Sequence, residues 1–351
     1  MSSLPDHPER MSPDWLAAQL GAEKGALKGF SSQEVGDGQM CQSFRLQLDW
    51  AQPQANLPAS IVAKCPHHEA RTRETAKTYH AYELETQWYQ HHAAQCPARV
   101  PHCYCVQLAE NGLDFVLLLE DLTPAYQKDQ PGGASEEEVL QMLAEAARLH
   151  AFAWQQPWLT ADWLNRRDPQ QEMIVALLPD LYEQWAERYR TRLDADILEA
   201  AKAMAHRYGR ITASQKTFPS LAHTDLRLDN VLFMKQERRA ALLDWQSVQR
   251  GPHMGDVAYC IATSFVDAEE RARREDELVR TYYAQLCAAG VADYDWTQCW
   301  DAYRLHAGVG VIMSIVAGVG VELTEQGYEI IAVLGERSAQ QMMHLETLSL
   351  F

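Results

Sequence analysis

The sequence has few cysteines, an excess of negative charge and a shortage of positive charge. Eight cysteines in 351 residues are too sparse for a disulfide framework, and a chain of this length can bury a sizeable core without one. The 31 Lys and Arg residues against 48 Asp and Glu give a formal net charge of −17. This balance argues against nucleic acid and anionic membrane surfaces as main partners.

Long apolar segments are also absent. Residues 1–15 carry three prolines with charges between them and no apolar core, so we predict no signal peptide. The most apolar stretch, residues 307–321, contains four glycines and is followed by Glu322, whereas a membrane helix needs about twenty apolar residues. We therefore expect a buried helix there, no membrane association, and a cytoplasmic protein.

Strand patterns come first along the chain. Residues 43–50 alternate between apolar and polar side chains, which predicts a half-buried strand, and residues 60–65 predict a second strand that pairs with it in an antiparallel hairpin. Residues 75–94 contain no proline or glycine and predict one helix. Two further strands, 102–108 and 113–119, flank the turn signal Asn111-Gly112.

Helical patterns dominate the later part of the chain. They run from Ser135 to about Tyr208, and resume after two short strands at 231–234 and 240–244. Early strands followed by helices predict an α+β fold with two lobes. We place the boundary after Leu122, giving an N-terminal lobe of residues 1–122 and a C-terminal lobe of residues 123–351.

The late strand pair carries the polar residues that indicate chemistry. Asn230 is expected to open the first of these strands and Asp244 to close the second. The ends of two antiparallel strands lie side by side, so an amide oxygen and a carboxylate would point to one place. Oxygen ligands of this kind suit Mg²⁺, with nucleotide phosphates supplying further ligands.

Asp225 precedes Asn230 by five residues, on the loop that leads into the strand pair. There it could accept the proton of an attacking hydroxyl group. A base followed by two metal ligands at this spacing is the layout that phosphoryl transfer needs, because the base orients the nucleophile while the metal holds the phosphates.

The order of several motifs resembles a known superfamily. The segments are Val62-Ala63-Lys64, Leu117 to Leu122, Leu149-His150-Ala151, His223 to Phe233, Asp244-Trp245-Gln246 and Gly251 to Tyr259. Together they resemble the protein-kinase-like phosphotransferases that act on small molecules, which include aminoglycoside phosphotransferases and choline kinases. The ecdysteroid-kinase-like branch is the closest match, and the resemblance runs from about residue 36 to residue 263.

The resemblance implies a role for individual residues. Asp225 would be the catalytic base, and Asn230 and Asp244 would be the metal ligands. Lys64 would hold the α- and β-phosphates of ATP while paired with a helix glutamate. Arg227 would lie near the transferred phosphate.

The partner of Lys64 and the nucleotide contacts are more open. Glu83 and Glu85 compete as partner, and we choose Glu85 because it shares a helix face with Tyr82 and Trp88. The resemblance makes residues 120–122 the adenine-binding hinge, and residues 36–43 the phosphate loop. The nucleotide contacts that it implies are Glu120, Asp121 and Leu122 of the hinge, and Gly36, Gly38 and Ser43 of the loop. This loop lacks the third glycine that protein kinases carry.

Structural interpretations compete with some of these roles. Arg227 could serve as an ion-pair partner of Asp229 or Glu120, and His223 is expected to brace the catalytic loop. Asp256 is predicted to be a helix N-cap, and in the family also braces that loop. Cys103 and Cys105 are expected to be structural and not metal ligands.

The function predicted from these residues is an ATP- and Mg²⁺-dependent transfer of phosphate to a hydroxyl group of a small molecule. An apolar or aromatic alcohol, a steroid-like compound or a hydroxyacyl thioester is favoured as acceptor, with Trp154, Trp158, Trp163 and Trp185 as possible pocket walls. A cationic acceptor of the aminoglycoside or choline type is the alternative, and a pseudokinase regulator is the alternative of another class. GTP in place of ATP, and a monomer or a homodimer, stay open.

Overall fold

The computed structural model describes residues 4–36, 38–52, 55–165, 168–214, 219–320 and 323–350. The chain divides into two compact units: the first comprises residues 1–96, 100–124 and 243–248, and the second comprises residues 97–99, 125–242 and 249–351. Residues 97–99 thus belong to the second unit although the residues on either side belong to the first. Residues 243–248 belong to the first unit although the residues on either side belong to the second. The boundary after Leu122 stays a prediction.

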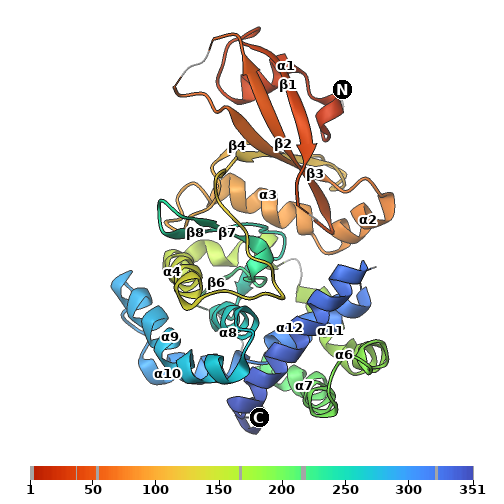
Figure 1. Ribbon diagram of the computed structural model, residues 1–351, viewed down its shortest axis with the longest axis vertical. Helices are drawn as coiled ribbons and strands as arrows, with labels where there is room; N and C mark the ends of the chain where they lie inside the picture. The colour runs from red at the N-terminus through yellow and green to blue at the C-terminus, as the bar shows by residue number, and fades with distance from the viewer. Residues whose placement is uncertain are drawn as a thin grey trace. The chain divides into compact units, whose positions relative to one another are not determined.

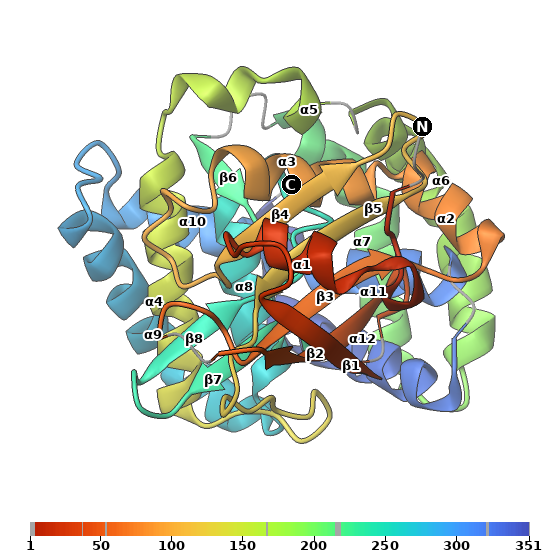
Figure 2. The same cartoon turned by 90° about the horizontal axis from the view of Figure 1, so that it is seen from above.

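The first unit contains an antiparallel sheet of five strands in the order β1-β2-β3-β5-β4 (Figure 1, Figure 2). Its elements are η1 (Pro8–Arg10), α1 (Pro13–Gln19), β1 (Leu27–Glu34), β2 (Cys41–Trp50), β3 (Ser60–Pro66), α2 (Ala70–Thr78), α3 (Ala81–His91), β4 (Cys103–Leu108) and β5 (Phe115–Glu120).

Strand β5 is buried on both faces, which explains its unbroken apolar run. Val116 and Leu118 pack in one cluster with Leu16 of α1. Phe115, which faces the other way in a strand, contacts the ring of Tyr82 on α3 at 4.4 Å between centroids. A strand covered on both sides needs apolar residues at every position.

Several predictions for this unit are confirmed, one is wrong, and one strand was missed. The β2–β3 hairpin and the turn at Gly112, which has φ of 68°, are present. The single helix expected over 75–94 is instead two helices, α2 and α3, because His80 adopts a left-handed conformation with φ of 54° between them. Strand β1, whose sequence alternates poorly, was not predicted.

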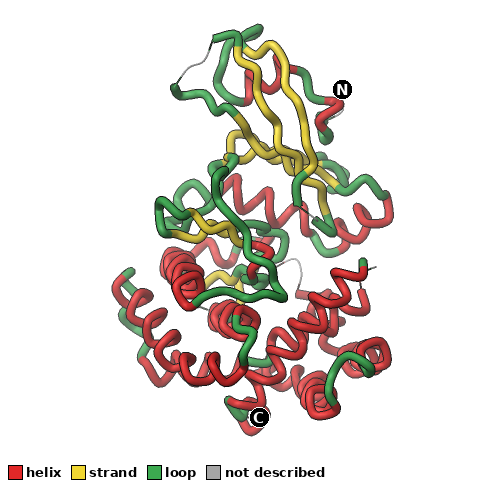
Figure 3. The backbone as a smooth tube through the Cα atoms, in the orientation of Figure 1, coloured by secondary structure: helices red, strands yellow, loops and turns green. Residues whose placement is uncertain are grey.

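The second unit is mainly helical, with strands limited to two short pairs (Figure 3). Its elements are α4 (Glu136–Ala153), η2 (Pro157–Thr160), α5 (Asp162–Asn165), α6 (Asp168–Tyr189), α7 (Ala195–Ser214), β6 (Ser220–Ala222), η3 (Leu228–Asn230), β7 (Val231–Met234), β8 (Arg239–Leu242), β9 (Gln249–Gly251), α8 (His253–Ser264), α9 (Ala268–Ala288), α10 (Trp296–His306), α11 (Val309–Gly320), α12 (Glu325–His344) and η4 (Thr347–Leu350). The α+β fold class is confirmed.

Two local features of this unit are the capping box that begins α4 and the strand pair β7–β8. Ser135 and Glu138 form a capping box that begins α4, with the Ser135 hydroxyl accepting from the Glu138 amide. The β7–β8 pair is antiparallel, as expected, and Val231 pairs with Leu242. Asn230 ends η3 directly before β7, and Asp244 lies two residues after β8, so neither residue is inside the strand where we expected it.

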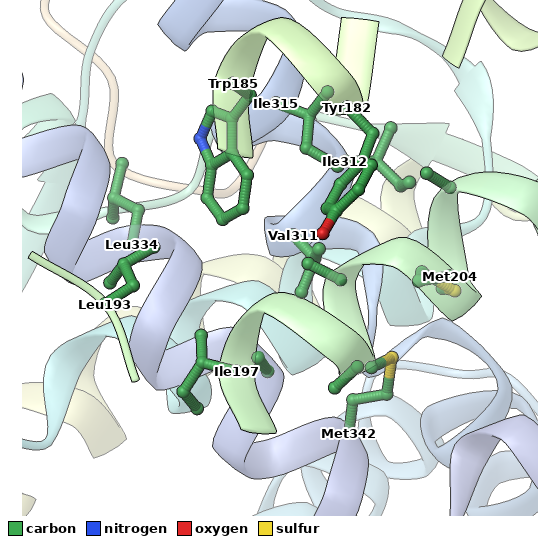
Figure 4. Packing of buried hydrophobic residues seen from close by; sticks show 14 of the residues in the cluster. Tyr182, Trp185, Leu193, Ile197, Met204, Val311, Ile312, Ile315, Leu334 and Met342 are labelled. Atoms are coloured by element: carbon green, nitrogen blue, oxygen red, sulfur yellow. The ribbon is translucent and has the colours of Figure 1, made fainter. Parts of the chain in front are cut away.

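The apolar stretch 307–321 is largely α11, which packs against α12 and α6 as the predicted core helix (Figure 4). Trp185, Val311 and Ile315 meet in this cluster. Among the described residues, the helical segment 296–320, which comprises α10 and α11, is long and apolar enough to cross a membrane by length and composition, and 56% of its most apolar part is buried inside the protein. A buried core helix passes the same test. Val321 lies outside the described residues.

The close approach of α11 to its neighbours gives a stability test. A Cβ on Gly310 would lie 2.1 Å from Ser338 Oγ and 2.8 Å from Tyr259 Cδ2, whereas a Cβ on Gly320 would meet nothing within 4 Å. We expect Gly310→Ala to lower the free energy of unfolding by about 1–3 kcal/mol, and Gly320→Ala to leave it unchanged or slightly raised. Urea denaturation measures both, and equal effects would contradict the packing.

Candidate active site

The first unit holds a buried ion pair between Lys64 on β3 and Glu85 on α3. The Lys64 Nζ lies 2.7 Å from Glu85 Oε2 and 2.8 Å from Oε1, and the two residues are 7% and 1% exposed. A buried lysine without a partner would be costly, so the pair is what allows Lys64 to occupy the sheet. Glu83, the competing residue, instead contacts His80 at 3.0 Å.

Asp244 is a second carboxylate on Lys64. Its Oδ1 lies 3.0 Å from Lys64 Nζ, and 39% of its side chain is exposed. Burial acts to lower the pKa of Lys64, but the negative charges of Asp244 and Glu85 outweigh it and hold the pKa well above its usual value. Lys64 is therefore protonated and contacts two carboxylates, the buried one of Glu85 and the partly exposed one of Asp244.

The residues next to Asp244 anchor the segment 243–248 in this unit. The Trp245 ring stacks on Trp88 with centroids 4.2 Å apart, and the Trp245 amide donates to Glu85 Oε1 at 3.3 Å. Asp244 itself has φ of 59°, which turns the chain between β8 and Trp245. Sequence reasoning did not predict this anchor, because Trp88 and Trp245 are far apart in the chain.

The predicted phosphate loop joins β1 to β2. Gly36 has φ of 75°, and a Cβ on Gly38 would lie 2.6 Å from the carbonyl oxygen of Cys41, so both glycines are required by the turn. Ser43 pairs with Lys64 in the sheet register. Tyr82, which we did not predict in this role, donates its hydroxyl to the Met40 carbonyl at 2.6 Å. Asp37 lies outside the described residues.

The predicted hinge, residues 120–122, is held by the side chain of Asp121. The Asp121 carboxylate accepts from Ser60 Oγ at 2.7 Å and from Arg45 Nε at 2.8 Å. Burial acts to raise the pKa of Asp121, but these hydrogen bonds and those from Thr123 lower it. The Glu120 amide donates to the His102 carbonyl, so an adenine contact by Glu120 would have to use its carbonyl group. Leu122 is buried.

The second unit holds the loop that carries Asp225. Asn230 Nδ2 donates to the Asp225 carbonyl at 2.9 Å and to Asp225 Oδ2 at 2.8 Å. Arg227 Nε donates to Asp225 Oδ1 at 3.1 Å, and Arg227 also pairs with Asp229, one of the two acidic partners considered for it. Two residues of the same loop, Asn230 and Arg227, therefore hold the Asp225 carboxylate by hydrogen bonds.

A buried carboxylate on α8 accepts hydrogen bonds from the backbone of this loop. Asp256, 1% exposed, accepts from the amides of His223 at 2.6 Å and Thr224 at 2.7 Å. His150 of α4 contacts the same carboxylate at 3.1 Å. We expected Asp256 to be the N-cap of its helix, and this prediction is wrong. Helix α8 begins earlier, at His253, after Pro252. Its bracing contacts with the loop are present.

The tryptophans predicted as pocket walls and the cysteine pair lie outside the contacts described so far. Trp185 is fully buried and donates to Ser314 Oγ at 3.1 Å, and Trp154 donates to Asp293 at 2.9 Å. Cys103 and Cys105 are free thiols. Within the described ranges, no group of three or more His, Cys, Asp or Glu side chains could hold a metal ion.

The comparisons place the chain in a family. Residues 35–290, more than half of the chain, match the model of the ecdysteroid kinase-like family. The chain belongs to this family. Its members are kinase-like small-molecule phosphotransferases, so the recognition made from the motifs is confirmed. A search of curated protein sequences finds no match.

Solved structures show the same fold at low identity. A mutant aminoglycoside 2′-phosphotransferase IIIa in complex with GDP has a TM-score of 0.56 at 12% identity, covering 92% of this chain and 95% of that one. The GDP and kanamycin complex of the aminoglycoside phosphotransferase APH(2″)-IIIa gives 0.51 at 13%, covering 92% and 97%. A Ralstonia eutropha protein described as an aminoglycoside phosphotransferase gives 0.50 at 16%, covering 95% and 97%.

The ion pair gives a test with an internal control. Glu85→Gln removes the buried charge partner of Lys64, and we expect the free energy of unfolding to fall by about 2 kcal/mol. Glu83→Gln, two residues away on the same helix, should change it by less than about 0.5 kcal/mol. Urea denaturation of both variants measures the difference. Equal losses would show that the Lys64–Glu85 pair has no special weight.

Proposed function

We propose that the protein transfers the γ-phosphoryl group of ATP to a hydroxyl group of a small molecule, with Mg²⁺ as cofactor. The observation that carries this proposal is the double hydrogen bond from Asn230 to Asp225, which fixes the proposed base and a proposed metal ligand to each other. Family membership supports the reaction class.

Asp225 is the proposed catalytic base. The acceptor hydroxyl oxygen forms a bond to the γ-phosphorus while the bond from that phosphorus to the β,γ-bridging oxygen breaks, releasing ADP. The hydroxyl proton passes to the Asp225 carboxylate. Because Asp225 Oδ1 and Oδ2 each accept a hydrogen bond within the loop, the carboxylate is oriented before the acceptor arrives, and catalysis comes mainly from position and charge.

The side chains fit a divalent cation. Both hydrogen bonds of Asn230 to Asp225 use the amide nitrogen, which leaves the oxygen, the atom that a cation binds, outside them. The Asp244 carboxylate is partly exposed. These are the hard oxygen ligands that Mg²⁺ takes. When bound, Mg²⁺ would neutralise phosphate charge, and Asn230 and Asp244 are the residues proposed to hold it.

Lys64 and Arg227 are the proposed positive charges for the phosphates. Lys64 would contact the α- and β-phosphates, with Gly36, Gly38 and Ser43 of the loop beside them, and Glu120, Asp121 and Leu122 are proposed to border the adenine. A triphosphate carries about four negative charges in a protein of net charge −17. Local cations and the metal therefore have to offset the surrounding acidity.

The proposed acceptor is an uncharged alcohol. We favour an apolar or aromatic alcohol, a steroid-like compound or a hydroxyacyl thioester over a cationic amino sugar or choline-like compound, because the family match is to the ecdysteroid kinase-like branch. A pseudokinase would be expected to lack the base or a metal ligand, and Asp225, Asn230 and Asp244 are all present. GTP in place of ATP, a monomer or a homodimer, and a cytoplasmic location remain predictions.

Replacement of the base tests the reaction. We expect Asp225→Asn to lower kcat by about 10²- to 10⁴-fold while nucleotide affinity changes little, because the substituted amide keeps the size of the carboxylate and removes the proton acceptor. A panel of alcohols with ATP and Mg²⁺ provides the assay. Asp301→Asn, on an exposed position of α10, is the matched control. Equal turnover by wild type and Asp225→Asn would refute the mechanism.

The metal proposal has its own test. Chelation by EDTA should abolish turnover, and added Mg²⁺ should restore it. Asp244→Asn should raise the Mg²⁺ concentration for half-maximal activity by about tenfold or more, because a charged ligand is lost. Full activity in EDTA, or an unchanged Mg²⁺ requirement in Asp244→Asn, would contradict the ligand assignment.

A further inference from the structure

A buried glutamine far from the motifs contacts the catalytic loop. Gln130, in the connection before α4, has an exposed fraction of 0%, and its Oε1 accepts from the backbone amide of Leu228 at 2.9 Å. Leu228 is the first residue of η3, and its N-cap residue Arg227 supplies no side-chain cap. A helix start leaves amides without an internal partner, and Gln130 satisfies this one from 98 residues away.

The other end of the same side chain is also committed. Gln130 Nε2 donates to the carbonyl of Thr263 at 2.9 Å, in the last turn of α8. This helix also carries Asp256, which accepts from the amides of His223 and Thr224. Gln130 therefore ties the end of the catalytic loop to the helix that already holds its beginning.

Arg337 of α12 fixes Gln130 and Thr263 together. Its Nη1 donates to the Thr263 carbonyl at 2.8 Å and to the Gln130 carbonyl at 3.0 Å, and its Nη2 donates to the Pro131 carbonyl at 2.6 Å. Arg337 is 8% exposed, and a cation at the carboxyl end of a helix is stabilised by the aligned carbonyl dipoles. The rigid guanidinium fork suits three carbonyl acceptors.

Two neighbouring contacts run along the same line. Tyr126 and Phe233 exchange both backbone hydrogen bonds, at 3.1 Å and 2.7 Å, and Gln127 Nε2 donates to the Asp229 carbonyl. Segment 126–130 thus follows the chain from Leu228 to Phe233. Both side-chain hydrogen bonds of Gln130, to Leu228 and to Thr263, are buried.

We infer that Gln130 is a positioning residue for phosphoryl transfer, held in place by Arg337. By fixing Leu228 it fixes η3, which ends at Asn230, and Asn230 in turn holds Asp225. A displacement of about 1 Å in a catalytic group can cost about a hundredfold in rate. This role rests on the proposed function, and it adds a residue that none of the family motifs contains.

The test compares two buried glutamines. Gln130→Met keeps size and burial but removes both hydrogen bonds, and we expect kcat to fall about ten- to a hundredfold with nucleotide affinity unchanged within about twofold. Gln341→Met on α12 is the matched control. Gln341 is also fully buried and donates to Glu275 Oε1 and the Tyr303 hydroxyl. It should lose stability while kcat is retained.

Hydrogen exchange gives a readout that does not depend on turnover. The Leu228 amide should exchange faster in Gln130→Met and at the wild-type rate in Gln341→Met, under conditions where both variants are folded. Unchanged exchange at Leu228, unchanged kcat in Gln130→Met, or equal losses of kcat in the two variants would overturn the inference. If Asp225→Asn keeps full turnover, the proposed function fails instead, and the exchange result still decides whether Gln130 positions the loop.

Discussion

The chemistry proposed for this protein depends on the buried charge of Lys64. Removing an ammonium group from water costs several kcal/mol unless carboxylates compensate it, and Lys64 in β3 is compensated by Glu85 and Asp244. The same requirement brings residues 243–248 into the first unit, where Trp245 stacks on Trp88. Satisfying one cation therefore also places the carboxylate that we propose as a metal ligand.

The second unit solves a different problem, which is to hold an irregular loop without regular secondary structure. Its backbone amides are satisfied by side chains: Asp256 accepts from His223 and Thr224, and Gln130 accepts from Leu228. Buried networks of this kind are rigid when every member is satisfied. The loop can then present Asp225 in one orientation, which is what a reaction driven by position and charge requires.

Local signals in the sequence predicted much of the fold, while the site residues inferred from the motifs stay predictions. The alternation of 43–50 and the turn at Gly112 each act over a few residues, and both are present. The helix over 75–94 failed because a left-handed histidine breaks it without a glycine or proline to mark the place. Asp256 was assigned to its own helix start, where a cap is common, although its partners come from the loop.

Long-range contacts explain what the sequence could not reveal. Gln130 and Arg337 belong to no sequence motif. Their partners are backbone amides and carbonyls that are remote in the chain. Tyr82 was placed on the correct helix face, but its hydroxyl contact with Met40 depends on the path of the phosphate loop.

The most direct measurement is a crystal structure of the protein with a non-hydrolysable ATP analogue and Mg²⁺. Our account predicts the α- and β-phosphates on Lys64 and the metal coordinated by the side-chain oxygens of Asn230 and Asp244, with the Asp225 carboxylate facing the γ-phosphate across space for a hydroxyl group. A nucleotide bound away from Lys64, or a metal that neither Asn230 nor Asp244 touches, would contradict it.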